Sequence, residues 1–230
     1  MHIWDTVVSH CTQTDVMRYF LFLGGFLMEN RKQTVRILAE SAVMVALATI
    51  LSMLQVWDSP YGGSVTVLSM APIILLSMRH GVKTGLLAGF AYSVIQLLQG
   101  LSNLAWIPTP MGIVLGALLD YILPFTLLGL AGLLRNVKIG NNAQMHPIYC
   151  AALGALMVTV IRYACHVISG VVIWYELDLE WYADDPTHIV NLYGPWMFSI
   201  IYSAIYMVPE IIATTIGTGL LNKALAKFNV

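Results

Sequence analysis

The chain has 230 residues, of which 58% are hydrophobic and only 10% are charged, and its formal net charge is -1. Soluble domains carry about 25% charged residues, so this composition excludes an ordinary soluble protein. The near-neutral charge gives no indication of a nucleic-acid partner, and the length leaves no room for a sizeable soluble domain beside one membrane bundle. The three cysteines (Cys11, Cys150 and Cys165) have neither CxxC nor metal-ligand spacing, so we expect no disulfide framework and no metal site.

Residues 1–27 do not fit the pattern of the rest of the chain. The apolar run from Phe20 to Leu27 is too short to span a membrane, and charged residues interrupt the sequence before it. The stretch also lacks the basic start and the small-residue cleavage site of a signal peptide. Two interpretations stay open: an extension upstream of a start at Met28, or an interfacial helix. We therefore expect a non-core extension over 1–27 and the membrane domain over 28–230.

From Thr34 onward, long apolar runs predict an all-α integral membrane protein with six transmembrane helices in one bundle. The expected spans are 35–56, 65–78, 82–98, 111–134, 147–174 and 196–221. An even number of spans places both termini on the same side of the membrane.

The basic residues indicate which side this is. They lie at the start of the first span, between the second and third, between the fourth and fifth, and after the sixth (Arg31, Lys32, Arg36, Arg79, Lys83, Arg135, Lys138, Lys223 and Lys227). The opposite loops, 57–64, 101–110 and 175–195, contain no Lys or Arg, and the last of them is acidic. The positive-inside rule therefore predicts cytoplasmic termini and three outward-facing loops.

The loop 57–64 combines turn-forming and aromatic residues and is followed by a short span. This pattern predicts a flap over an outward-facing cavity. The alternative is that its aromatic residues belong to the interfacial belt of the membrane.

A ladder of polar and aromatic residues lies within the fifth span. Arg162, His166, Gly170 and Trp174 follow each other at i+4, so they share one helix face over roughly 18 Å. That face carries a cation, an imidazole, a glycine without a side chain and a large aromatic ring. A charge inside a membrane segment is costly and usually functional, so the ladder indicates a recognition site.

Asp120 in the fourth span is expected at a depth similar to that of Arg162 and His166. With Tyr121 and Tyr202 nearby, these side chains predict a polar pocket in the outer half of the bundle. The alternative is an Asp120–Arg162 ion pair that only locks two helices together.

Two further acids in the spans have simpler explanations. Glu40 can pair with Arg36 one helical turn away. Glu210 follows Pro209, and we expect it to be structural or to lie at the cytoplasmic contact surface.

Small residues repeat at i+4 in two spans: Gly81, Gly85 and Gly89 in the third, and Ala42 and Ala46 in the first. Such spacing allows close helix packing, either inside the bundle or, for Ala42 and Ala46, against another membrane subunit. No GxxxxGK[ST], HExxH or GxSxG motif and no carboxylate dyad is present, so we expect no catalytic centre and no cofactor.

Several short strings occur in the order of a known family. They are Gly62-Gly63-Ser64-Val65-Thr66, Met70-Ala71-Pro72-Ile73, Arg79-His80-Gly81, Leu119-Asp120-Tyr121, the run from Arg162 to Gly170, and Tyr206-Met207-Val208-Pro209. Over about residues 30–225 the chain resembles the thiamine-specific substrate-binding subunit, or S component, of energy-coupling factor (ECF) transporters.

The resemblance implies a multi-pass protein of the bacterial plasma membrane that captures thiamine from outside. It would then dock on a module of one transmembrane coupling subunit and two ATPase subunits, which supply the energy. The resemblance makes the face with Ala42 and Ala46 the docking surface.

The resemblance also implies roles for individual residues. Asp120 would pair with the aminopyrimidine of thiamine, while Tyr121 and Arg162 would hold its hydroxyethyl end. His166 would donate or accept a hydrogen bond with the ligand, and Trp174 would stack on it. Stacking on the thiazolium cation agrees with the attraction between a cation and a ring face.

Other expected binding residues are less regular. Trp57 would correspond to a lid tryptophan, and Gly170 belongs to the ladder. In the sixth span Phe198 and Ser203 replace a tyrosine and an asparagine that the family usually has, next to Tyr202. A lost hydrogen bond predicts weaker affinity for thiamine, or a preference for a thiamine relative or precursor.

Two rival functions stay open. A self-sufficient proton-coupled secondary carrier could use Asp120 or Glu210 as its proton site, although no inverted repeat is visible. A membrane-embedded enzyme acting on a lipid would need a metal-binding carboxylate cluster, which the sequence lacks.

Overall fold

The computed structural model describes residues 31–59, 63–139 and 143–227. The chain divides into two compact units, 1–40 and 41–230. Of the first unit the structure describes only residues 31–40, which are helical. The expected extension over 1–27 lies outside the described residues.

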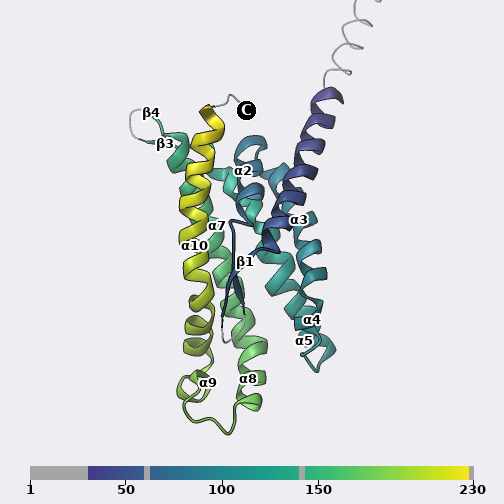
Figure 1. The fold of residues 1–230 in the computed structure, drawn as a ribbon, viewed down its shortest axis with the longest axis vertical. Coiled ribbons are helices and arrows are strands. Elements are labelled where there is room, and N and C mark those ends of the chain that lie inside the picture. Colours follow the sequence, from purple (N-terminus) through teal and green to yellow (C-terminus); the bar gives the residue numbers. More distant parts are fainter. Residues whose placement is uncertain (1–30, 60–62, 140–142, 228–230) are drawn as a thin grey trace, which may run out of the picture. The chain divides into compact units, whose positions relative to one another are not determined.

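Helices account for most of the described chain (Figure 1). The first runs over Arg31–Ser52. It is followed by β1 (Gln55–Asp58), β2 (Ser64–Thr66), α2 (Ala71–His80), α3 (Val82–Gln99) and α4 (Leu101–Leu104). The next helical segment consists of α5 (Pro110–Gly116), the π-helix η1 (Ala117–Ile122), α6 (Leu123–Thr126) and the 3₁₀-helix η2 (Leu127–Leu134). Then come β3 (Lys138–Ile139), β4 (Ala143–Gln144), α7 (Pro147–Ser169), the π-helix η3 (Gly170–Trp174), α8 (Tyr175–Trp181), α9 (Ile189–Leu192) and α10 (Pro195–Lys227).

Within the described residues, four helical segments are long and apolar enough to cross a membrane: Arg31–Ser52, Pro110–Leu134, Pro147–Trp181 and Pro195–Leu225. The expected second and third spans also contain helices, but α2 has only 10 residues. At ~1.5 Å per residue it covers about half of a ~30 Å hydrocarbon core. The count of six spans therefore stays a prediction.

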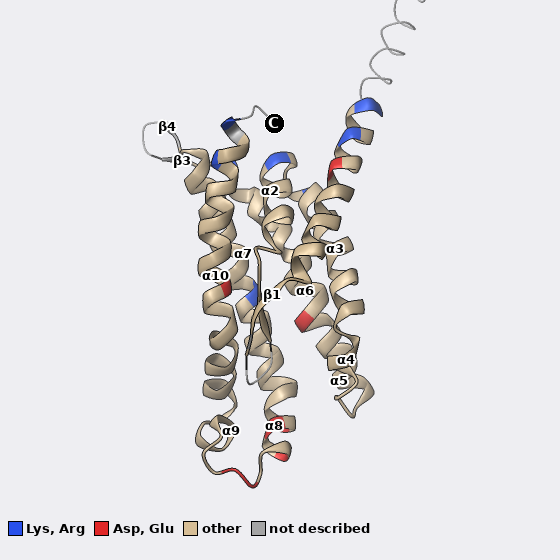
Figure 2. Ribbon diagram, viewed as in Figure 1, with Lys and Arg blue, Asp and Glu red and all other residues tan. Residues whose placement is uncertain are grey.

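Charge is separated along the unit 41–230. Figure 2 shows its Lys and Arg mostly near the end where α10 finishes, and acidic residues around the α8–α9 connection at the other end. This is the asymmetry on which the positive-inside prediction depends. The cytoplasmic position of both termini stays a prediction.

The first two expected span boundaries are wrong, because a β-hairpin lies between them. The first helix ends at Ser52 rather than at 56, and residues 65–70 form strand and turn rather than helix. Strands β1 and β2 are antiparallel, with Trp57 opposite Val65. Gly63 has a φ of +81°, which a residue with a side chain rarely adopts. Apolar run length alone does not separate such short strands from helix.

The fifth span also ends later than expected, since the helix continues through α8 to Trp181. Leu177 is buried and packs with Ile173, Leu104 and Ile107. Glu176 and Glu180 are exposed on the other side of the helix. Glu176 and Glu180, two of the acidic residues that indicated a loop, therefore form the solvent-facing half of an amphipathic turn, whereas Asp178 between them is buried.

The core centres on α2, which is buried from Ala71 to Ser77. The Ser77 hydroxyl donates to the Gly129 carbonyl and accepts from the Gly132 amide at 2.9 Å. A Cβ at Gly89 would lie 2.8 Å from the backbone oxygens of Phe125 and Thr126. The small residues of α3 thus serve packing inside the bundle, the first of the two interpretations offered by their spacing.

Candidate functional site

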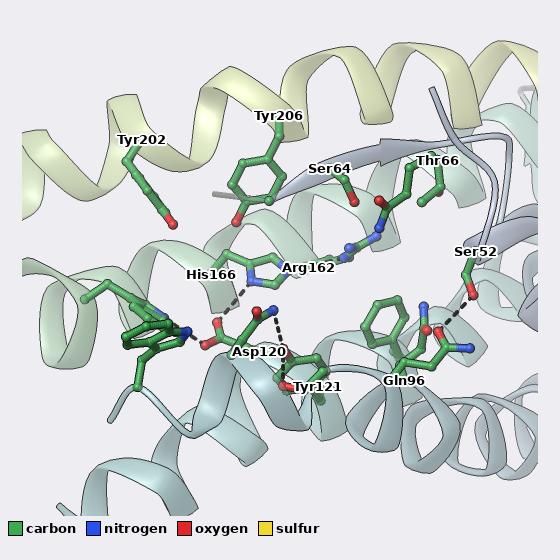
Figure 3. Close-up of a pocket in the computed structure, with 18 of the residues that line it drawn as sticks. Ser52, Ser64, Thr66, Gln96, Asp120, Tyr121, Arg162, His166, Tyr202 and Tyr206 are labelled. Carbon is green, nitrogen blue, oxygen red and sulfur yellow. Dashed lines mark hydrogen bonds and ion pairs between the residues drawn. The ribbon is translucent and has the colours of Figure 1, made fainter. Parts of the chain in front are cut away.

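A pocket of about 780 Å³ lies within the unit 41–230. Its described walls come from the end of the first helix at Ser52, the β1–β2 hairpin, α3, α4, η1, α6, the α7–η3–α8 segment and α10. Figure 3 shows side chains from these elements pointing toward one another across the cavity. The volume falls within the range of about 300–1,000 Å³ that small-molecule sites occupy.

Asp120 accepts three hydrogen bonds on one side of the pocket. Its Oδ2 accepts from the Ser169 hydroxyl at 2.7 Å and from the Trp174 indole Nε1 at 3.0 Å. Its Oδ1 lies 3.1 Å from His166 Nδ1 (Figure 3). Asp120 belongs to the π-helix η1 and Trp174 to the π-helix η3, and such widened turns recur at functional sites.

Arg162 is linked to Asp120 through His166 rather than directly. Its Nε donates to His166 Nε2 at 3.3 Å, which leaves the proton of a neutral His166 on Nδ1, where it faces Asp120. The Arg162 guanidinium also contacts Met70 Sδ at 2.9 Å and lies 4.5 Å from the centre of the Phe125 ring. The direct Asp120–Arg162 ion pair considered as an alternative is therefore wrong for this structure.

Two expected tyrosines also line the pocket. The Tyr121 hydroxyl donates to the Gly100 carbonyl at 3.3 Å and accepts from Asn103 Nδ2 at 3.3 Å. Tyr202 on α10 stacks on Phe198, with ring centres 5.4 Å apart. The ladder residues Arg162, His166 and Trp174 line the same cavity, so the structure brings the expected polar groups together.

Four expected site residues are not among the pocket walls. Phe198 is fully buried between Tyr175 and Tyr202, and Ser203 on the same helix is also fully buried. Gly170 is buried where a Cβ would lie 2.8 Å from the Ser199 side chain. Trp57 lies on β1 with 44% of its surface exposed. The orientation of each side chain about its helix or strand, which a single sequence does not reveal, accounts for these positions.

Several pocket residues were missed by sequence reasoning. Asp178 and Tyr182 continue the i+4 ladder beyond Trp174, and Tyr206 follows Tyr202 by the same step. Extending the period into the acidic stretch would have found the first two, had that stretch not been taken for a loop. Gln96 and Thr66 carry no comparable signal, because ordinary polar residues are frequent at helix ends and in strands.

Glu210 holds the hairpin against α10. It is 2% exposed, and its two oxygens accept from the Thr66 amide and the Thr66 hydroxyl, both at 2.8 Å. Of the two roles considered for Glu210, the structural one is therefore confirmed. Since Ser64 and Thr66 line the pocket, this carboxylate fixes one pocket wall.

The arrangement favours binding over catalysis. It offers hydrogen-bond acceptors, one guanidinium and several ring faces, which can orient a flat polar molecule. In the part of the chain that the structure describes, no group of three His, Cys, Asp or Glu side chains could hold a metal ion.

Comparison with known sequences identifies similar proteins over most of the chain. The profile of the family described as "Thiamine transporter protein (Thia_YuaJ)" matches residues 38–230. The chain is 33% identical over 194 residues to the thiamine transporter ThiT of Bacillus subtilis, covering 82% of this chain and 91% of that protein. It is 28% identical over 203 residues to the thiamine transporter ThiT of Lacticaseibacillus paracasei, covering 84% and 90%.

A solved structure has a similar fold. ThiT from Listeria monocytogenes aligns with a TM-score of 0.60 at 22% sequence identity, over 85% of this chain and 97% of that one. At this identity the similarity concerns the fold alone.

Proposed function

Because this chain belongs to the thiamine transporter family, whose members are bacterial membrane transporters and not enzymes, we propose that its pocket binds thiamine for uptake. The single observation that supports this most is the position of Asp120, a carboxylate that lines a cavity and is oriented by three donors. As a multi-pass protein of the plasma membrane, the chain would receive its ligand from outside the cell.

The proposed contact with the aminopyrimidine follows from which hydrogen-bond acceptor positions of Asp120 are already used. An ionised carboxylate has about four acceptor positions, and Oδ2 already uses two of them for Ser169 and Trp174. Oδ1 uses one for His166, so it keeps a position for the exocyclic amino group of the ligand. The bound amino group would complete the hydrogen bonding of this carboxylate.

The remaining parts of thiamine have matching groups in the pocket. The ring of Trp174 offers a face for the thiazolium cation. Arg162, which has no carboxylate partner among the described residues, is proposed to hold the hydroxyethyl oxygen together with Tyr121. His166 contacts both Arg162 and Asp120, so it connects the proposed sites for the hydroxyethyl group and for the aminopyrimidine.

The two positions in α10 at which this chain differs from the usual family residues affect ligand binding less than the sequence indicates. Phe198 and Ser203 are fully buried and do not line the pocket, whereas Tyr202 and Tyr206 do. We therefore propose thiamine as the ligand rather than a precursor. Gly170 would act indirectly by allowing η3 and α10 to approach, and Trp57 would act as a lid residue carried by the hairpin.

The test is a titration of the purified full chain in detergent, followed by the quenching of tryptophan fluorescence. We expect saturable, tight binding of thiamine and much weaker binding of its separate aminopyrimidine and thiazole halves. Tighter binding of either half than of thiamine would mean that the ligand is a thiamine precursor. A folded protein with no response to any of the three would overturn the proposed function.

We also propose that the chain works as the S component of an ECF transporter, docking through Ala42 and Ala46. Both side chains are exposed, and only 6% of the apolar window of the helix Arg31–Ser52 is buried. Small exposed residues at i+4 allow a second helix to approach closely. The partner would be the transmembrane coupling subunit, with two ATPase subunits supplying energy.

Uptake by cells that contain the partner subunits tests the docking proposal. Ala46→Trp should abolish thiamine uptake while leaving binding to the purified protein unchanged, because the pocket is untouched. Leu47→Trp, on a different face of the same helix and also exposed, is the matched control and should retain uptake. Accumulation of thiamine by the chain alone in vesicles with a proton gradient would instead establish a self-sufficient carrier.

A further inference from the structure

Asp178 is a second acid in the pocket, and neither the family resemblance nor the proposed thiamine contacts assign it a role. It lies on α8, it is 7% exposed, and it lines the cavity. It follows Trp174 by one helical turn, which places the two side chains about 5–6 Å apart at their Cβ atoms. Trp181, Tyr182 and Tyr202 also line the cavity, so this carboxylate belongs to an aromatic part of the pocket.

The Asp178 carboxylate has no compensating partner. Among the described residues it accepts no hydrogen bond and forms no ion pair, whereas Asp120 receives three donors. Arg162 is the one Lys or Arg among the described pocket residues, and it precedes Asp178 by 16 positions on the same helical segment. At ~1.5 Å per residue the two are on the order of 20 Å apart along the helix, too far for an ion pair.

An ionised group that is buried without donors is unfavourable unless a cation approaches it. The surrounding aromatic rings strengthen this preference, because ring faces attract cations. The occupant that suits this place is therefore a flat cation.

We infer that Asp178 is the counter-ion for the permanent positive charge of the bound ligand, held between its carboxylate and the Trp174 ring. This rests on the proposed function, in which that charge is the thiazolium ring of thiamine. Asp120 then serves the neutral aminopyrimidine and Asp178 the cationic ring. Trp174 joins the two regions, since its indole N–H donates to Asp120 while Asp178 lies one turn farther along the helix.

The geometry agrees with the shape of such a ligand. The two rings of thiamine are joined by one methylene bridge, so their recognition sites must be close. One helical turn advances about 5.4 Å, which is the separation expected between a contact at the level of Trp174 and one at Asp178.

The experiment compares a charged and a neutral ligand on two matched variants. Thiamine and an analogue in which a thiophene ring replaces the thiazolium are titrated into the purified full chain by calorimetry. Asp178→Asn should weaken thiamine binding by about tenfold to a hundredfold and change binding of the neutral analogue less than threefold. Glu176→Gln, an exposed acid on the same helix, should leave both ligands unaffected.

Each other outcome has a definite meaning. Unchanged thiamine affinity in Asp178→Asn overturns the inference and leaves the proposed function standing. An equal loss for both ligands assigns Asp178 a structural role and also overturns it. If Asp178→Asn does not fold, the unsubstituted protein decides the matter, because equal affinity for the charged and the neutral ligand excludes a counter-ion. A protein that binds neither ligand overturns the proposed function together with the inference.

Discussion

Asp120 and Glu210 are carboxylates with little solvent exposure in two regions of the molecule, and their donors differ in kind. Three side chains from the α7–η3 segment donate to Asp120 or pair with it, and its side chain keeps 12% exposure toward the pocket. Glu210 is 2% exposed and receives both of its hydrogen bonds from Thr66 on the hairpin. Burial alone therefore does not distinguish a binding acid from a structural one. What distinguishes them is whether an oxygen remains that another molecule can reach.

Asp120→Asn should have the largest effect on binding. The amide oxygen could still accept from Ser169 and Trp174, but the NH2 group would then replace the oxygen that faces His166 and the proposed ligand amino group, and the charge would be lost. We expect thiamine affinity to fall about a hundredfold, or about 3 kcal/mol. Calorimetric titration measures this, with Asp184→Asn in the exposed acidic loop as the control. An affinity within threefold of the unsubstituted protein would contradict the role of Asp120.

Glu210→Gln should affect stability more than binding. One N–H of the new amide would face a Thr66 donor, so we expect the free energy of unfolding to fall by about 1–3 kcal/mol. Thermal unfolding in detergent measures the change. Thr66→Val, which removes only the hydroxyl, completes a double-mutant cycle that isolates the interaction. Lost binding at unchanged stability would place Glu210 in the binding site and erase the contrast with Asp120.

Trp174→Phe tests how much one of the three donors contributes to the function of Asp120, because it removes that donor and keeps an aromatic ring. The indole N–H to Oδ2 is lost, and the ring face remains available to the ligand. We expect a smaller loss of thiamine affinity, about threefold to tenfold, or ~0.5–1.5 kcal/mol. Fluorescence is compromised by this substitution, so calorimetry is the appropriate measurement. A loss as large as that of Asp120→Asn would mean that the indole, rather than the carboxylate, dominates recognition.

Phe198→Tyr should have the smallest effect. It restores the phenol usual in the family, but Phe198 is fully buried against Tyr175 and Tyr202 and does not line the pocket. The added hydroxyl would meet packed side chains, so we expect affinity to change less than twofold and stability to fall slightly. A tenfold gain in affinity would show that position 198 reaches the ligand. Tyr202→Phe, which removes a phenol from the pocket wall, is the matched comparison.

Much of the site could be predicted because its residues share one helical period. The i+4 spacing of Arg162, His166 and Trp174 puts them on one face of any regular helix, and all three line the pocket. Asp178 obeys the same rule and was missed only because acidic residues around it indicated a loop. The β-hairpin was missed for a different reason: its strands of four and three residues lie partly in the expected loop 57–64 and partly in the ends of the two adjoining apolar runs.

The sequence by itself determined the membrane class, the approximate helices and the polar face of the fifth one, because composition and local period follow directly from the order of residues. Tertiary structure alone decided which acid meets which donor. Glu210 and Thr66 are 144 positions apart, and Asp120 and Trp174 are 54 apart. Such pairs depend on how each helix is rotated about its axis and how far it is shifted along its neighbours. The packing of the whole bundle sets both quantities, and no local pattern contains them.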